Sequence, residues 1–177
     1  MEGRVLARGR ARWFFAGHMV VTAASLLLLL LALGALDVNV EDRPAWVLLG
    51  VMLALYVPAG WITARWQGWS RPTPGEGVRA VLLPALTAWA WALTGWGLVT
   101  LTPQSEVGMW MLLSTGLFAT PSFFLMLLTL LHLATEPLWQ PVWYLAMGLA
   151  GLLPPLLFVL GSILPKRRLT TAENVIN

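Results

Sequence analysis

Five long apolar stretches constrain the fold of this chain more than any other feature of its sequence. A helix that crosses the hydrocarbon core of a membrane needs about 20 consecutive apolar residues, and every stretch reaches that length. Because hydrocarbon offers the backbone no hydrogen-bond partners and no alternating barrel pattern is visible, we expect all of them to be helical. The stretches are residues 13–36, 45–64, 78–101, 107–133 and 142–164.

The composition supports a membrane location. Of the 177 residues, 58% are hydrophobic and 11% are charged, whereas a soluble domain carries about 25% charged residues. One soluble domain of this size cannot bury so much apolar surface, and disorder requires low hydrophobicity. The sequence therefore predicts an all-α, polytopic integral membrane helix bundle, with residues 1–177 forming a single membrane domain.

Catalytic and metal-binding motifs do not emerge from the sequence. There is no cysteine, which excludes disulfides, thiolate catalysis and iron–sulfur clusters. Nucleophile-elbow, zinc-protease and Walker motifs and paired intramembrane carboxylates are not found. The acidic segment 37–44 does not fit a calcium-binding EF-hand, because Asp42 and Leu48 stand where that loop needs Gly and Glu. We therefore assign no catalytic residue, no metal site and no cofactor.

The positions of Arg and Lys predict the orientation, because cytoplasmic loops carry an excess of them. With a cytoplasmic N-terminus and five crossings, seven basic residues lie inside and four outside, and the reverse orientation inverts this ratio. Residues 1–12 then form a basic cytoplasmic arm that favours anionic lipid, and the Arg-, Ala-, Gly- and Leu-rich composition suggests a bacterial inner membrane. The inside set is Arg4, Arg8, Arg10, Arg12, Arg65, Arg71 and Arg79, and the outside set is Arg43, Lys166, Arg167 and Arg168.

The fifth stretch leaves two topologies open. Pro154 and Pro155 lie at its middle, and neither can donate a backbone hydrogen bond. We favour a kinked spanning helix, with Gly148 and Gly151 packed against a neighbouring span and the basic, polar tail 165–177 outside. The alternative is a re-entrant hairpin with the prolines at its tip. That hairpin would return the tail to the cytoplasm and place ten basic residues inside and one outside.

Two histidines are the candidate cofactor-binding residues. With five crossings, His18 and His132 fall in the same leaflet, where two imidazoles could ligate a haem or a metal. A pair of histidines without a third ligand is a poor metal signature. The favoured alternative is that both lie at the interface and are solvated by lipid headgroups.

Tryptophan is unusually frequent, with eleven residues. Most lie near the predicted helix ends, as in the aromatic belts of membrane proteins, but Trp89, Trp91 and Trp96 lie deep in the third stretch. Trp89 and Trp96 share a helix face and Trp91 points elsewhere, and a buried indole needs a partner for its N–H. An apolar or planar ligand held between these indoles is the functional interpretation, and simple packing is the favoured one. Candidate partners are Thr87, Thr94, Ser114 and Thr115.

The spans contain few polar groups. Apart from the two histidines, and Arg79 at the edge of the third stretch, their polar residues are Ser and Thr. The absence of Asp, Glu, Lys and Arg near the bilayer centre argues against a self-sufficient pump or ion-coupled transporter. Gly95 and Gly97 predict close helix approach in the third stretch.

We expect a non-catalytic membrane component that packs with partner proteins or a second copy, or binds a lipophilic molecule. The alternatives are a small permease or transport-complex subunit, and a membrane enzyme acting on lipid headgroups. Nucleic acid is not an expected partner, since the basic residues flank apolar stretches.

Overall fold

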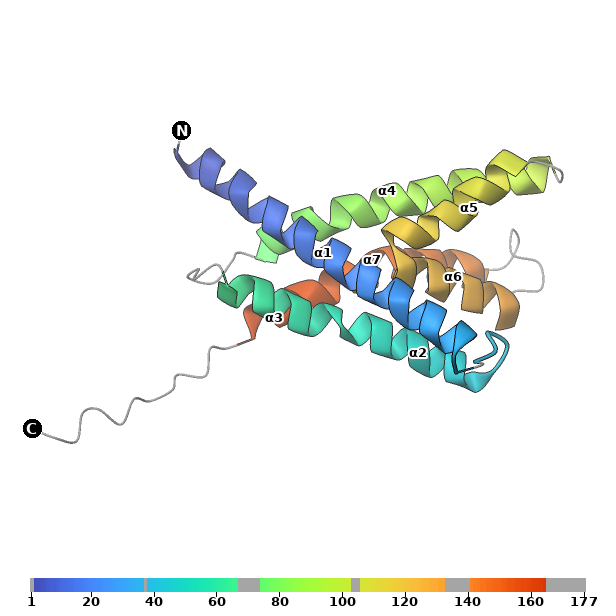
Figure 1. The fold of residues 1–177 in the computed structure, drawn as a ribbon. Coiled ribbons are helices and arrows are strands. Elements are labelled where there is room, and N and C mark those ends of the chain that lie inside the picture. Colours follow the sequence, from blue (N-terminus) through green and yellow to red (C-terminus); the bar gives the residue numbers. More distant parts are fainter. Residues whose placement is uncertain (1, 37, 67–73, 103–105, 133–140, 165–177) are drawn as a thin grey trace, which may run out of the picture.

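The described part of the chain is all-helical. The computed structural model describes residues 2–36, 38–66, 74–102, 106–132 and 141–164, and it contains no strand within these ranges (Figure 1). The helices are α1 (Glu2–Gly34), α2 (Arg43–Ala54), α3 (Tyr56–Trp66), α4 (Pro74–Leu101), α5 (Glu106–Phe118), α6 (Thr120–His132) and α7 (Pro141–Ile163).

Three helical segments are long and apolar enough to cross a membrane. They are Arg12–Gly34, Arg43–Trp66 and Gly75–Leu101, and they correspond to the first three predicted stretches. The second segment consists of α2 and α3, which follow one another in nearly the same direction (Figure 1). Pro58 explains the break between them, because it has no N–H for the carbonyl of Ala54, four residues earlier.

The prediction of one spanning helix over residues 107–133 is wrong. The chain reverses at Ala119, so that α5 runs beside the last part of α4 and α6 returns toward the same end of the bundle (Figure 1). Pro121 accounts for the break: it cannot donate to the carbonyl of Leu117, four residues earlier, whereas proline is tolerated in the first turn of the helix that follows. The Thr120 hydroxyl instead donates to the carbonyl of Gly116 over 2.6 Å. We call α5 and α6 the re-entrant hairpin, because the chain enters and leaves it on the same side of the bundle (Figure 1).

The fifth stretch is one helix, α7, which continues through the buried Pro154 and Pro155. The alternative hairpin at these prolines therefore does not form. A Cβ atom on Gly148 or Gly151 would meet no described atom within 4 Å, so neither glycine is a point of close helix approach, although Gly151 is buried.

The closest helix approaches occur at other glycines. A Cβ atom on Gly161 of α7 would overlap the backbone carbonyl of Val57, and one on Gly60 of α3 would overlap that of Phe158. Gly95 approaches α5 as expected, since its Cβ would lie 3.0 Å from the carbonyl oxygen of Gly108, whereas Gly97 has nothing within 4 Å.

The reversal at Ala119 determines which helix ends lie together. Helix α7 ends beside the end of α3, on the same side of the bundle as the N-terminal part of α1 (Figure 1): the rings of Phe14 and Phe158 meet edge to face at 5.4 Å. The ring centroids of Trp13 and Trp66 are 6.3 Å apart. We call this the basic end, because it carries Arg12, Arg65 and Arg79. The opposite end carries Glu41, Asp42, Arg43 and Glu106.

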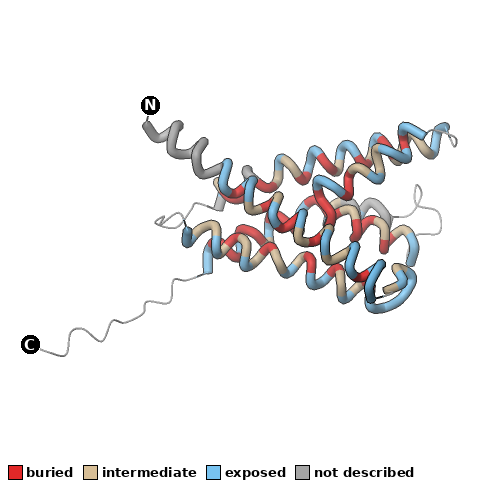
Figure 2. The backbone as a smooth tube through the Cα atoms, in the orientation of Figure 1, coloured by how far each residue is buried: buried red, intermediate tan, exposed pale blue. Residues whose placement is uncertain are grey.

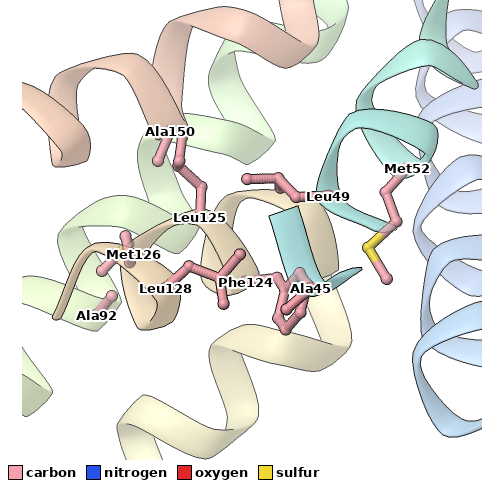
Figure 3. Packing of buried hydrophobic residues seen from close by; sticks show 9 residues of the cluster. All are labelled: Ala45, Leu49, Met52, Ala92, Phe124, Leu125, Met126, Leu128 and Ala150. Carbon is pink, nitrogen blue, oxygen red and sulfur yellow. The ribbon is translucent and has the colours of Figure 1, made fainter. Parts of the chain in front are cut away.

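Two clusters of buried apolar side chains hold the bundle together. The smaller cluster lies toward the basic end and consists of Phe14, Val21, Tyr56, Val81 and Phe158. The larger one joins α2, α4, α6 and α7, with Ala45, Leu49, Met52, Ala92, Phe124, Leu125, Met126, Leu128 and Ala150 (Figure 3).

Large apolar side chains also cover the outside of the bundle. Val20, Leu83 and Leu156 are examples, each more than half exposed, and exposed positions follow the outer faces of the helices (Figure 2). An outer surface of this kind suits lipid contact.

Candidate functional site

A buried polar cluster lies on the inner face of α1. His18, Thr22 and Ser25 are spaced four and three residues apart and therefore share one face, and all three are almost completely buried. Tyr56 of α3 is buried beside them, with its hydroxyl 3.1 Å from His18 Nδ1. The favoured interfacial, headgroup-solvated placement of His18 is therefore wrong: its ring is enclosed by the bundle.

The tip of the re-entrant hairpin lies against this polar cluster. The backbone of Phe118 is beside the His18 imidazole, and the Thr120 hydroxyl lies 3.3 Å from the carbonyl oxygen of Thr22. On the other side of the tip, Ser122 donates to the carbonyl of Ala150 in α7 over 2.6 Å. The polar groups at the reversal are thus surrounded by protein, with Thr120 and Ser122 both buried.

The polar cluster retains unused hydrogen-bonding capacity. Within the described ranges, His18 Nε2, Thr22 Oγ1 and Ser25 Oγ are buried and make no hydrogen bond of good geometry, although the Phe118 backbone lies beside His18 and Tyr56 lies beside Thr22. A buried polar group without a partner costs about 1–3 kcal/mol, so these atoms are the most unusual polar feature of the interior. The sequence analysis missed Thr22, Ser25 and Tyr56. The spacing of the first two from His18 is the signal that could have found them.

The structure does not bring His18 and His132 together. His132 is exposed at the opposite end, where its Nε2 lies 2.9 Å from the carbonyl oxygen of Val40 and its ring lies 5.7 Å from Trp46. His132 lies near the far end of α1, sixteen residues beyond His18. At about 1.5 Å per residue, the two histidines are therefore roughly 24 Å apart along the helix axis. The cause is the reversal at Ala119, so a haem or metal shared by the pair does not fit. No three His, Asp or Glu side chains gather as a metal site in the described ranges.

The three deep tryptophans face different surroundings. Trp91 is 48% exposed and donates its indole N–H to Ser114 Oγ over 2.9 Å, one of the partners expected from the sequence. Trp89 and Trp96 instead pack against the larger core cluster, so the expected divergence of Trp91 is confirmed. The structure does not place a planar ligand site between the three indoles.

A lateral groove opens between α1 and α4, which we call the α1–α4 groove. Its volume is about 570 Å³, and its wall includes Met19 of α1, Leu83 and Trp91 of α4, and Phe118 at the hairpin tip. The groove exists because the re-entrant hairpin stops at mid-depth and leaves the half of α1 and α4 nearer the basic end uncovered. The hydroxyl of Thr87, also in the wall, donates to the carbonyl of Leu83 over 2.9 Å, so the lining is almost entirely apolar.

A second groove lies between α1 and α3, which we call the α1–α3 groove. It has a volume of about 340 Å³ and extends from Trp13 and Trp66 at the basic end to Ala24 and Leu55 near mid-depth. Small side chains in its wall, including Ala16, create the hollow. Helix α1 is therefore flanked by two apolar grooves in the same half of the bundle.

Comparison of the chain with protein-family models, curated proteins and solved structures gives no significant match.

Proposed function

We propose that the chain is a multi-pass integral membrane protein whose basic end lies in the cytoplasm. The exposed apolar side chains on the outer faces and the charged residues at the two ends support this location. Segments α1, α2–α3, α4 and α7 would cross the membrane, and the re-entrant hairpin would enter and leave from the outer side. This arrangement has four crossings.

The distribution of basic residues supports the orientation. Arg12, Arg65 and Arg79 lie at the basic end, and Arg43 lies at the opposite end. The first turns of α1, the segment that connects α3 to α4 and the segment that follows α7 contain every other Arg and Lys. Four crossings therefore place ten of the eleven basic residues in the cytoplasm, which satisfies the positive-inside rule far better than the seven of the five-crossing arrangement.

Cysteine labelling tests this topology in a chain that has no native cysteine. Asn39→Cys, at the opposite end, should react with an impermeant maleimide added outside intact cells. Asn177→Cys should react only after the membrane is opened. Outside labelling of Asn177→Cys would refute four crossings and restore the arrangement with five.

We further propose that the protein binds a lipophilic molecule in the α1–α4 groove. The single observation that carries this proposal is the geometry of that groove: a hollow of about 570 Å³ with an apolar wall that opens sideways. Ligand pockets in proteins typically measure about 300–1,000 Å³ and are predominantly apolar. Because the groove lies in the half nearer the basic end, its ligand would enter from the cytoplasmic leaflet.

Photolabelling with a diazirine-bearing palmitic acid in nanodiscs tests this proposal. Cross-links should concentrate on groove residues such as Met19 and Phe118, and Thr87→Trp should remove them by filling the groove. Thr94→Trp is the matched control: Thr94 is also exposed on α4 and donates to a carbonyl four residues earlier over 2.9 Å. Cross-links spread evenly over the outer surface, or retained in Thr87→Trp, would contradict the proposal.

The re-entrant hairpin favours a second candidate, a small permease or a membrane subunit of a transport complex. Non-helical backbone at membrane depth occurs where it is enclosed by protein or lines a polar path, and the tip here contacts His18 and Thr22. Co-purification of an ATPase or a larger permease with the tagged chain would support this candidate. Photolabelling confined to the groove, with no associated subunit, would support lipophile binding.

A further inference from the structure

We propose that the α1–α3 groove is a specific site for an anionic phospholipid of the cytoplasmic leaflet, with one acyl chain in the groove and the headgroup at Arg12 and Arg65. This site is separate from the α1–α4 groove and does not depend on ligand binding there. It does rest on the proposed orientation, in which the basic end faces the cytoplasm.

The dimensions of the groove fit one acyl chain. On α1 its wall runs from Trp13 to Ala24, which is about 16 Å at 1.5 Å per residue. Half of the hydrocarbon core is about 15 Å thick, so the groove has the depth of one leaflet. The hydroxyl of Thr63, the polar side chain in this wall, donates to the carbonyl of Ala59 over 2.7 Å and leaves the lining apolar.

The hollow results from small residues on facing helices. Ala16, Gly17 and Ala24 of α1 face Ala59 of α3 across the groove. A Cβ atom on Gly17 would lie 2.9 Å from the Thr63 hydroxyl oxygen, so the helices already approach closely at the floor. Larger side chains, including Val20 and Ile62, form the walls on either side of this floor. The result is a narrow slot that suits a flexible acyl chain.

The mouth of the groove has the chemistry of a phospholipid headgroup site. Trp13 and Trp66, with ring centroids 6.3 Å apart, mark its outer end, and tryptophan favours headgroup level. Each is preceded in sequence by an exposed arginine, Arg12 and Arg65. Guanidinium groups form paired hydrogen bonds with phosphate oxygens.

The local charge favours an anionic lipid over a zwitterionic one. The described side chains of α1 and α3 include no carboxylate. The guanidinium carbon of Arg65 lies 5.0 Å from the centre of the Trp61 ring, so a cation–π contact keeps this charge at the surface without neutralising it. Among the described side chains, attraction of a headgroup at this position is therefore not offset by an acidic neighbour on either groove helix; Glu76, also at the basic end, lies on α4.

Native mass spectrometry of the full chain in detergent, with dioleoylphosphatidylglycerol or dioleoylphosphatidylcholine added, tests the site. The wild type should bind phosphatidylglycerol more tightly than phosphatidylcholine. Arg12→Gln and Arg65→Gln should each weaken phosphatidylglycerol binding about fivefold, the change that corresponds to about 1 kcal/mol for each basic residue near an anionic group. Arg79→Gln, at the same end but on α4, should leave the affinity unchanged.

A second pair of variants tests the acyl-chain slot. Ala16 and Ala23 are both exposed on α1, but only Ala16 lines the groove. Ala16→Phe should abolish tight lipid binding, whereas Ala23→Phe should not, and circular dichroism should show that both variants keep their helices. Three outcomes would each overturn the proposal. The wild type could bind the two lipids equally, Arg79→Gln could weaken binding as much as Arg12→Gln does, or Ala16→Phe could retain tight binding. Thr87→Trp should not affect this binding, so failure at one groove is distinguishable from failure at the other.

Discussion

The contact between α3 and α7 gives the sharpest test of the architecture. Gly161 of α7 faces the backbone carbonyl of Val57, and an added methyl group at this glycine would overlap that oxygen. Gly151 lies ten residues earlier on the same helix and has open space at the same position. Gly161→Ala and Gly151→Ala therefore make the same chemical change in one helix, with opposite expected effects.

The magnitudes follow from two opposing contributions. Replacing a helical glycine by alanine stabilises a helix by about 1 kcal/mol, and this applies at both sites. Forcing a methyl group into a packed contact costs about 1–3 kcal/mol, and the upper value applies at Gly161 because the obstacle is backbone and cannot rotate away. Gly161→Ala should therefore lower the free energy of unfolding by about 2 kcal/mol, whereas Gly151→Ala should raise it by up to about 1 kcal/mol.

Reversible unfolding in mixed micelles, followed by circular dichroism, measures both values. A difference of about 3 kcal/mol between the two alanine variants is expected from the sum of these contributions. Gly60→Ala, on the α3 side of the same contact, should behave like Gly161→Ala, because its Cβ would overlap the carbonyl of Phe158. Equal stabilities of the Gly161 and Gly151 variants would show that α3 and α7 do not approach closely at these glycines.

Three further changes address the interior. Thr120→Val removes the hydroxyl that donates to a hairpin carbonyl over 2.6 Å and should lower the free energy of unfolding by about 1 kcal/mol; an unchanged unfolding midpoint would contradict that role. Tyr56→Phe leaves His18 Nδ1 without its 3.1 Å contact and should cost about 1–3 kcal/mol, measured in the same assay, with no loss if the contact does not form. Two single-tryptophan variants test the placement of α4 by fluorescence. Trp89 packs against the core, so a variant that retains only this tryptophan should emit at shorter wavelength and resist quenching by iodide. Trp66 is 80% exposed at the basic end, so iodide should quench the fluorescence of a variant that retains only Trp66. Equal quenching would refute the placement of α4.

Hydropathy and proline positions predicted part of the fold. The first three apolar stretches form helical segments of about the predicted extent, because a long run of apolar residues can satisfy its backbone in lipid only as a helix. The divergence of Trp91 from Trp89 and Trp96 also followed from helix periodicity alone. Hydropathy does not predict whether an apolar segment runs straight or turns back. An apolar hairpin and an apolar spanning helix have the same composition.

The candidate site was less predictable because its members come from different helices. His18 was identified from the sequence, but its depth was misjudged, since nothing local shows that Tyr56 of α3 lies against it. The α1–α4 groove was not predictable at all. It depends on where α5 stops, and that position is set by the break before Pro121.

The difference between two proline sites explains why a hairpin was an alternative at Pro154 and Pro155 but formed at Pro121. Pro154 and Pro155 are adjacent and lie in the middle of an apolar run, yet α7 continues through them, with both rings buried by neighbouring helices. The single Pro121 breaks its helix, and polar side chains at the break find partners: Thr120 donates to Gly116 and lies near the carbonyl of Thr22, and Ser122 donates to Ala150, the carbonyl that Pro154 leaves without its helical donor. A reversal in a membrane requires such partners more than it requires many prolines. The polar side chains of α1 therefore favour the reversal at Ala119, and that reversal places the end of α7 on the same side of the bundle as Arg12 and Arg65.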